Sequence, residues 1–122
     1  EVARIEVHKE VRVAAYKALG TLADPSSAAV LTSGLRDPLW EIRAQAARGL
    51  GLIGSISAVQ PLADCLNDEQ WWVRRNAGEA LTKLGPEGKT TLLKAYRQTF
   101  SPATKEIAAQ WLDELELLPA AI

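Results

Sequence analysis

A repeat of 31 residues constrains this chain more than any other feature of its sequence. Apolar residues return at that interval in three copies, always in the same order. The recurring residues are Val11, Ile42 and Val73; Ala15, Ala46 and Ala77; and Leu19, Leu50 and Leu81. A weaker fourth copy follows, with Ala108 and Leu112. A period of about this length built from two helices is typical of a solenoid, in which each repeat packs on its neighbours.

The spacing of apolar residues within each copy predicts a short helix followed by a long one. The expected helices are 8–22, 27–36, 39–53, 57–66, 70–84, 89–99 and 103–117. We expect Gly85 to Gly88 to form a break between two of them. No strand-like alternation competes with this pattern. We therefore predict an all-α fold, a right-handed α-solenoid of about four two-helix repeats, of which the first is incomplete.

Composition limits what the chain can be. The 122 residues fit one domain, 1–122, and 48% hydrophobic with 24% charged residues indicates a globular chain. Fourteen basic and fifteen acidic side chains argue against a dedicated nucleic-acid binder, and no apolar run is long enough for a membrane span. Cys65 is the single cysteine, which excludes an internal disulfide and fits a reducing, cytoplasmic compartment. The chain starts at Glu1 without any Met, so we expect a fragment of a longer protein.

Three stretches carry the repeat most clearly: DPLWEIRAQAARGLGLIG, SISAVQPLADCL and DEQWWVRRNAGEALTKLG. A turn Asp stands six residues before an Arg in two of them, as Asp37 with Arg43 and Asp68 with Arg74. Together these features resemble HEAT repeats of the short type named after phycobilisome lyases, in which that Asp and Arg are characteristic. The fourth copy departs from the family pattern because Thr99 replaces the Asp. The resemblance implies an α-solenoid whose second helices line one surface, usually used to bind other proteins.

Four cations, Arg12, Arg43, Arg74 and Lys105, lie one period apart and allow two interpretations. They form either a basic stripe for an anionic partner or a structural ladder, in which each guanidinium binds the acid six residues earlier. We favour the ladder because an acid precedes three of the four cations at that distance. The predicted ladder consists of Asp37, Arg43, Asp68, Arg74 and Arg12.

Trp72 is the main candidate for a binding residue. Its equivalents are Glu10 and Glu41, on the helix face opposite the apolar stripe. Trp is enriched in binding hot spots, although this ring is also able to fold over its neighbours, and both alternatives stay open. We expect the exposed ridge of the long helices, with apolar spots at Leu52 and Ile107, to bind a protein or peptide rather than nucleic acid. The candidate protein-binding residues are Trp72, Asn76, Glu79, Gln45, Arg48, Glu41 and Lys17.

The other tryptophans have structural interpretations. Trp40 and Trp71 lie one period apart, so we expect both to cover the turn at the start of a long helix. Trp111 stands where the earlier copies have Ala or Gly, small residues that let helices approach closely. We therefore predict that Trp111 caps the end of the solenoid.

Catalytic chemistry is hard to assemble from this sequence. His8 is the only histidine, and Cys65 falls on a helix stripe that we expect to be buried. Residues 85–93 imitate a phosphate-binding loop, but Lys83 replaces its first glycine and a helix precedes it. We expect a non-catalytic protein–protein interaction scaffold without cofactor or metal. The alternatives are an accessory subunit of an enzyme, as phycobilin lyases are, or a spacer in a longer or membrane-anchored protein; the oligomeric state stays open.

Overall fold

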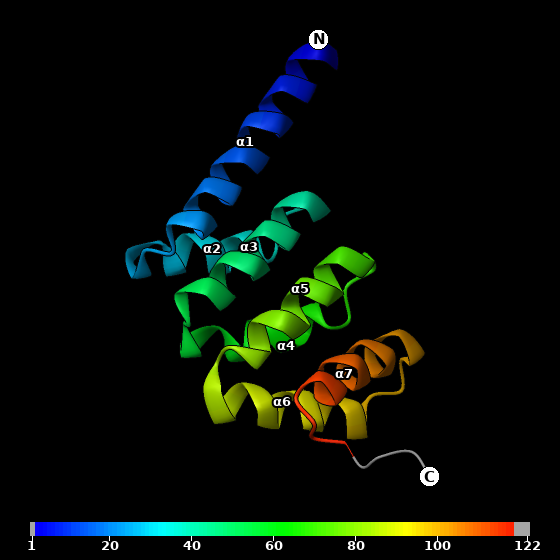
Figure 1. Cartoon of the computed structure of the whole chain (residues 1–122). Coiled ribbons are helices and arrows are strands. Elements are labelled where there is room, and N and C mark those ends of the chain that lie inside the picture. Colours follow the sequence, from blue (N-terminus) through cyan, green and yellow to red (C-terminus); the bar gives the residue numbers. More distant parts are fainter. Residues whose placement is uncertain (1, 119–122) are drawn as a thin grey trace.

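The computed structural model describes the backbone of residues 2–118 and the side chains of residues 8–118. Within this part the chain is helical and contains no strand (Figure 1). The elements are α1 (Val2–Leu22), η1 (Pro25–Ser27), α2 (Ala28–Gly34), α3 (Trp40–Ile53), η2 (Ile56–Ala58), α4 (Val59–Cys65), α5 (Trp71–Thr82), α6 (Gly85–Gln98) and α7 (Pro102–Glu114). None of these helices combines the length and the apolar character that crossing a membrane requires.

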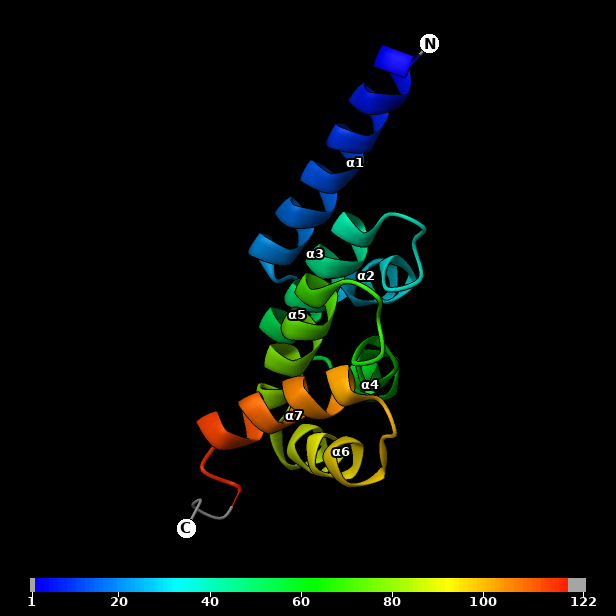
Figure 2. The ribbon, with the colours of Figure 1, turned by 90° about the vertical axis from the view of Figure 1, so that its right-hand side faces the viewer.

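The helices stack into two layers, which makes the molecule an α-solenoid. The long helices α1, α3 and α5 follow one another along one side, while α2 and α4 lie on the other side (Figure 2). α3 contacts both α1 and α5 extensively, and α2, α4 and α6 pack on α3, α5 and α7. The helix α7 crosses at a different angle from α5 (Figure 2). The first and last helices therefore lie at opposite ends of the stack.

The predicted apolar stripe forms the core in the second and third copies. Its fully buried members are Ile42, Ala46, Leu50, Val73, Ala77 and Leu81. Glycines allow the long helices to touch through their backbones, since a Cβ on Gly49 would lie 2.8 Å from the Cα of Gly20. A Cβ on Gly51 would lie 2.7 Å from the Cα of Ala80 in the same way. These close approaches hold α3 tightly between α1 and α5.

Aspartates shape the turns that lead into α3 and α5. The Oδ1 of Asp37 accepts a hydrogen bond of 2.9 Å from the N–H of Leu39, and the Oδ1 of Asp68 accepts one of 2.9 Å from the N–H of Gln70. Such bonds fix the turn just before the first helical residue. The two turns, and the long helices that follow them, therefore have the same geometry in both copies.

The first copy departs from the prediction of a packed apolar stripe. Val11, Ala15 and Leu22 are exposed on α1, and Leu19 is only half-buried. The reason is that, among the described residues, no helix of the second layer covers this face of α1. The helix also begins at Val2 rather than at residue 8, so α1 stays helical where the later copies have their Asp turn (Figure 1).

The predicted break at Gly85–Gly88 was wrong, because α6 begins at Gly85. Gly85 has a φ of 72°, a left-handed conformation that lets one residue reverse the chain after α5. Pro86 fits the first helical turn, where backbone N–H groups lack helical acceptors. Gly88 is needed for space, since a Cβ there would clash with the carbonyl of Leu81. The predicted bounds of the other helices differ from the structure mainly at their ends, where η1 and η2 precede α2 and α4.

Candidate protein-binding surface

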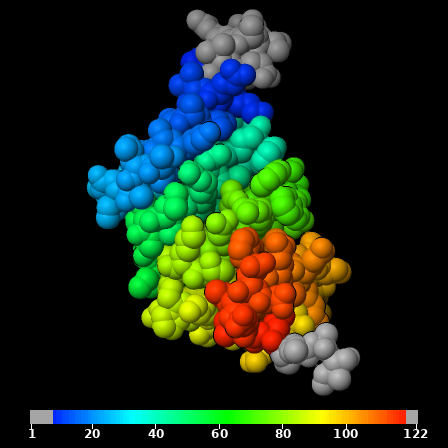
Figure 3. Space-filling model, in the orientation of Figure 1, coloured from blue at the N-terminus to red at the C-terminus, as the bar shows by residue number. Residues whose placement is uncertain are grey.

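The exposed ridge of the long helices contains three adjoining hollows, of about 270, 330 and 430 Å³. Val13 and Glu41 line both the 270 and the 430 Å³ hollow, and Asn76 lines both the 270 and the 330 Å³ hollow. Together we call the three hollows the long-helix groove. The groove is lined by Lys9, Glu10, Val13, Ala14, Lys17, Trp40, Glu41, Ala44, Gln45, Arg48, Gly51, Leu52, Trp72, Arg75, Asn76, Glu79, Ala80 and Lys83. Figure 3 shows the helices that carry it, α1, α3 and α5, one below the other on one face.

All seven candidate residues line this groove, but they divide among its hollows. Trp72, Gln45 and Glu41 lie together in one hollow between α3 and α5, beside Trp40 and Val13. A second hollow of the same two helices contains Arg48 and Glu79, and Asn76 borders both. Lys17 lies in the third hollow, which α1 forms with Glu41. The structure therefore brings the candidates into one continuous surface rather than one compact site.

Trp72 leaves 52% of its surface exposed. Its ring contacts the ring of Trp71 edge to face, with the centroids 4.8 Å apart and an angle of 76° between the planes. The guanidinium of Arg75 lies 5.9 Å from its centroid, within reach of a cation–π interaction. Neighbours thus support the ring from its own helix, while about half of it faces outward.

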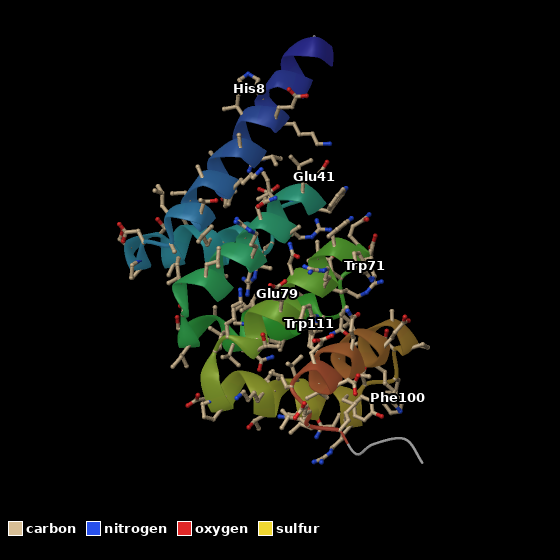
Figure 4. The ribbon with its side chains drawn as sticks, viewed as in Figure 1. His8, Glu41, Trp71, Glu79, Phe100 and Trp111 are labelled. Atoms are coloured by element: carbon tan, nitrogen blue, oxygen red, sulfur yellow. The ribbon has the colours of Figure 1, made fainter. Side chains whose placement is uncertain are left out.

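Trp40 and Trp71, which lie one period apart, are buried to different degrees. Trp40 packs against the buried core, whereas Trp71 is 46% exposed. The ring of Trp71 packs on Trp72, and its role as a cover for the turn before α5 stays a prediction. Two exposed indoles are therefore in contact at the start of α5, where Figure 4 labels Trp71.

Two of the three acids of the groove, Glu41 and Glu79, have basic partners. An ion pair of 2.6 Å joins Lys9 to Glu41, and the hydrogen bond from Lys9 lowers the pKa of Glu41. Glu79 accepts a bond of 2.9 Å from Arg75 and lies 3.6 Å from Lys83. The groove therefore presents paired acids beside an excess of cations.

Two of the candidate amides are more structural than the sequence suggests. The Nδ2 of Asn76 donates a hydrogen bond of 2.9 Å to the carbonyl of Ala44, which ties α5 to α3. The Oε1 of Gln45 is buried and accepts no hydrogen bond from the described residues.

Ile107, predicted to be an exposed apolar spot, is buried on α7 and only 2% exposed. The altered crossing of α7 moves its ridge away from the line followed by the earlier helices.

The arginine ladder joins neighbouring copies. The Nε and Nη2 of Arg43 donate to the two carboxylate oxygens of Asp68, at 2.8 and 3.1 Å. Its Nη1 donates to the backbone carbonyl of Asp37 at 2.9 Å, and Arg12 binds the carboxylate of Asp37 in turn. The carboxylate partners of Arg12 and Arg43 thus lie 25 residues later in the sequence. Asp37, six residues before Arg43, offers Arg43 only its backbone carbonyl. The sequence prediction had placed these ion pairs within one copy.

These contacts shift the pKa values of the ladder. The hydrogen bond to Asp68 raises the pKa of Arg43 further. Partial burial raises the pKa of Asp37, but the N–H of Leu39 and the guanidinium of Arg12 outweigh it, so this pKa lies below its ordinary value. Arg43 and Asp37 therefore keep their charge at neutral pH, which the ion pair of Arg43 with Asp68 and that of Asp37 with Arg12 require of them.

A profile of HEAT repeats matches residues 28–113, from the start of α2 to near the end of α7. The matched region makes up most of the chain and contains the repeated stripe and most of the ladder. The chain is a member of the HEAT repeat family. No curated protein matches it.

The HEAT repeat register slips at the last copy, which the sequence did not reveal. Trp111 packs against Gly78 of α5, where a Cβ would clash with the indole ring. The equivalent residue of the preceding HEAT repeat, Ala80, meets Gly51 instead. Trp111 therefore does not cover the open end as predicted, but packs back onto α5. The guanidinium of Arg75 lies 5.6 Å from this ring as well, so the same cation touches Trp72 and Trp111.

The thiol of this HEAT repeat array and its clusters of possible metal ligands can be described from the structure. Cys65 is buried, and burial raises the pKa of its thiol to about 12, which keeps it protonated and unreactive. Between residues 8 and 118, His, Cys, Asp and Glu side chains nowhere gather in threes to hold a metal ion. The groove offers the chemistry of binding: exposed indoles, cations and paired acids.

Proposed function

We propose that this HEAT repeat chain is a non-catalytic scaffold that binds a protein or peptide in the long-helix groove. HEAT repeats generally serve as protein-interaction scaffolds, and the described helices show the two-layer arrangement of such repeats. The observation that carries the proposal is the half-exposed ring of Trp72, which Trp71 and Arg75 hold at the edge of the groove. Trp and Arg are the residues most enriched where truncation costs a complex most of its affinity.

The charges of the groove indicate the kind of segment that binds there. Five cations line it against three acids, although the whole chain has a net charge of -1. The cations are Lys9, Lys17, Arg48, Arg75 and Lys83, and the acids are Glu10, Glu41 and Glu79. A segment with apolar side chains for Trp72 and Leu52 and a few carboxylates suits this lining. The interspersed acids disfavour a phosphate backbone, which needs a continuous row of cations.

The 31-residue period supports the short, phycobilisome-lyase type of repeat, and this assignment stays a prediction. It does not change the proposed mode of binding, because the groove is built from the long helices of adjacent copies. The mode depends on Trp72 and its neighbours whichever subtype applies.

The test is a binding measurement on peptides selected from a displayed random library against the wild-type chain. We expect Trp72→Ala to weaken these peptides by about 30-fold, the loss of a typical hot spot. Phe100→Ala is the matched control, because Phe100 is fully exposed and lies at the α6–α7 connection, far from the groove (Figure 4). Peptides that bind both variants equally well would remove Trp72 and the groove as the binding site.

A further inference from the structure

The positive charge of the long-helix groove is concentrated in one of its three hollows, the one of about 330 Å³ between α3 and α5. Arg48, Arg75 and Lys83 line this hollow together with a single acid, Glu79. In each of the other two hollows, acids are at least as numerous as cations. We call the hollow of these four charged residues the Arg48 hollow.

The acid of the Arg48 hollow, Glu79, uses both of its carboxylate oxygens within the chain (Figure 4). Its Oε2 accepts a hydrogen bond of 2.9 Å from Arg75, and its Oε1 lies 3.6 Å from the Nζ of Lys83. Arg75 is held further by the rings of Trp72 and Trp111, whose centroids lie 5.9 and 5.6 Å from its guanidinium carbon. The single acid is therefore shared between two cations, and the hollow keeps a net positive charge.

Within the described part of the chain, Arg48 is the one cation of this hollow that has no acidic partner. None of the ion pairs among the side chains of residues 8–118 includes it. Its Nη1 donates to the Oγ1 of Thr21 on α1 at 3.5 Å, which is long for a hydrogen bond. A guanidinium has five N–H donors in a planar fork that matches a carboxylate. Arg48 therefore has donors to offer to an anionic group that enters the hollow.

The remaining lining of the Arg48 hollow is partly apolar. Gly51 and Ala80, both buried, line it where α3 and α5 touch, since a Cβ on Gly51 would lie 2.7 Å from the Cα of Ala80. Leu52, one helical turn after Arg48, is 41% exposed beside them. The hollow thus suits a group with a short hydrocarbon part and an anionic end, as a glutamate side chain has.

We infer that the Arg48 hollow binds one glutamate side chain of the peptide segment that occupies the long-helix groove, with Arg48 as the residue that receives its carboxylate. The inference rests on the proposed function of the groove and adds which side chain is recognised, and where. Complementary charge is the argument for this occupant. Glu79 in the same hollow disfavours a phosphate group, because a phosphate has more negative charge than a carboxylate.

The positions of the hollows also set the distance between this glutamate and the apolar side chain bound at Trp72. Glu41 lines the hollow beside Trp72, and Arg48 lies seven residues later on the same helix, α3. A helix rises by about 1.5 Å per residue, so the two residues are about 10 Å apart along the groove. We expect the glutamate to stand about three residues from the apolar anchor in an extended segment, or about seven in a helical one.

The probes are peptides selected from the displayed random library and synthesised with amidated C-termini. We expect them to share a glutamate at this distance from an apolar residue. Arg48→Gln is expected to weaken them by about tenfold, the loss of one charged hydrogen-bonded pair. Replacing the glutamate of the peptide by glutamine is expected to cost the same. The two changes together are expected to cost no more than either alone, because each removes the same pair.

The matched control is Arg36→Gln. Arg36 is an exposed arginine that lines a hollow with Pro61 and Cys65, away from the groove. The substitution changes the charge of the chain by the same amount as Arg48→Gln, and we expect it to leave the affinity unchanged.

Several results would overturn the inference. Peptides that lose affinity in Trp72→Ala but keep it in Arg48→Gln would do so while the proposed function stands. Losses that add up when both partners are changed would place the glutamate elsewhere. Affinity that disappears on amidation would assign the hollow to the carboxylate of a chain end. Peptides indifferent to both variants, or a library without binders, would count against the groove and this subsite together.

Discussion

Arg74 has no acid at the position where Arg12 and Arg43 each bind an Asp. Arg43 donates to both carboxylate oxygens of Asp68, 25 residues later, but the residue 25 positions after Arg74 is Thr99. Thr99 still accepts the turn hydrogen bond from the N–H of Ser101, at 3.0 Å, as an Asp does in the earlier copies. It has no second oxygen for Arg74, whose buried Nε finds no acceptor among the described residues. A buried donor without a partner costs about 1–3 kcal/mol.

Thr99→Asp is expected to complete the ladder. The added carboxylate would keep the turn bond to Ser101 and accept from the Nε of Arg74, raising the free energy of unfolding by about 1 kcal/mol. Pairing lowers the pKa of this carboxyl in the folded state. The gain is therefore present at pH 7 and disappears as the pH falls through that lowered pKa. Urea unfolding at pH 7 and pH 3 measures both effects.

The control for this variant is the same substitution beside Arg74→Gln, which removes the guanidinium. We expect Thr99→Asp to add no stability in that background. An equal gain in both backgrounds would show that the aspartate acts on the turn alone, and no gain in either would contradict the role given to Arg74.

At the scale of the element, local patterns predicted what local forces decide. The bounds of α3 and α5 follow from the stripe and the Asp turns, which act within a few residues. The start of α6 was missed because Gly85 and Pro86 are compatible with both a break and a tight helix start. The partners of Arg43 and the exposure of the apolar stripe of α1 depend on neighbouring copies, which a local pattern does not contain. The sequence placed Trp72 opposite the apolar stripe and left open whether its ring folds over its neighbours, and its 52% exposure and the contact with Arg75 required the structure.

The packing of α7 on α5 depends on one glycine. We expect Gly78→Ala to lower the free energy of unfolding, although Ala favours a helix over Gly by about 1 kcal/mol. The reason is the clash of its Cβ with the ring of Trp111. In a Trp111→Ala background the clash is absent, so the same substitution is expected to stabilise. Urea unfolding of the four proteins measures this change of sign, and a stabilising effect in both backgrounds would refute the proposed packing.

At the scale of the whole molecule, stability is concentrated in the middle of the stack. α3 and α5 are covered by long helices on both sides and by the second layer, whereas α1 packs on one side only. In a solenoid, stability is approximately a sum over repeats and the interfaces between them. The terminal copy therefore contributes less than the central ones, although its residues are of the same types.

Val11 and Val73 test this distribution, because both are valines and they occupy equivalent positions in the first and third copies. Val73 is fully buried and Val11 is 62% exposed. We expect Val73→Ala to reduce the free energy of unfolding by about 2 kcal/mol, through lost apolar burial and the cavity left behind. Val11→Ala is expected to change it by less than about 0.5 kcal/mol. Both substitutions alter helix propensity equally, so urea unfolding reports the difference in packing. Similar losses would mean that Val11 is covered in solution.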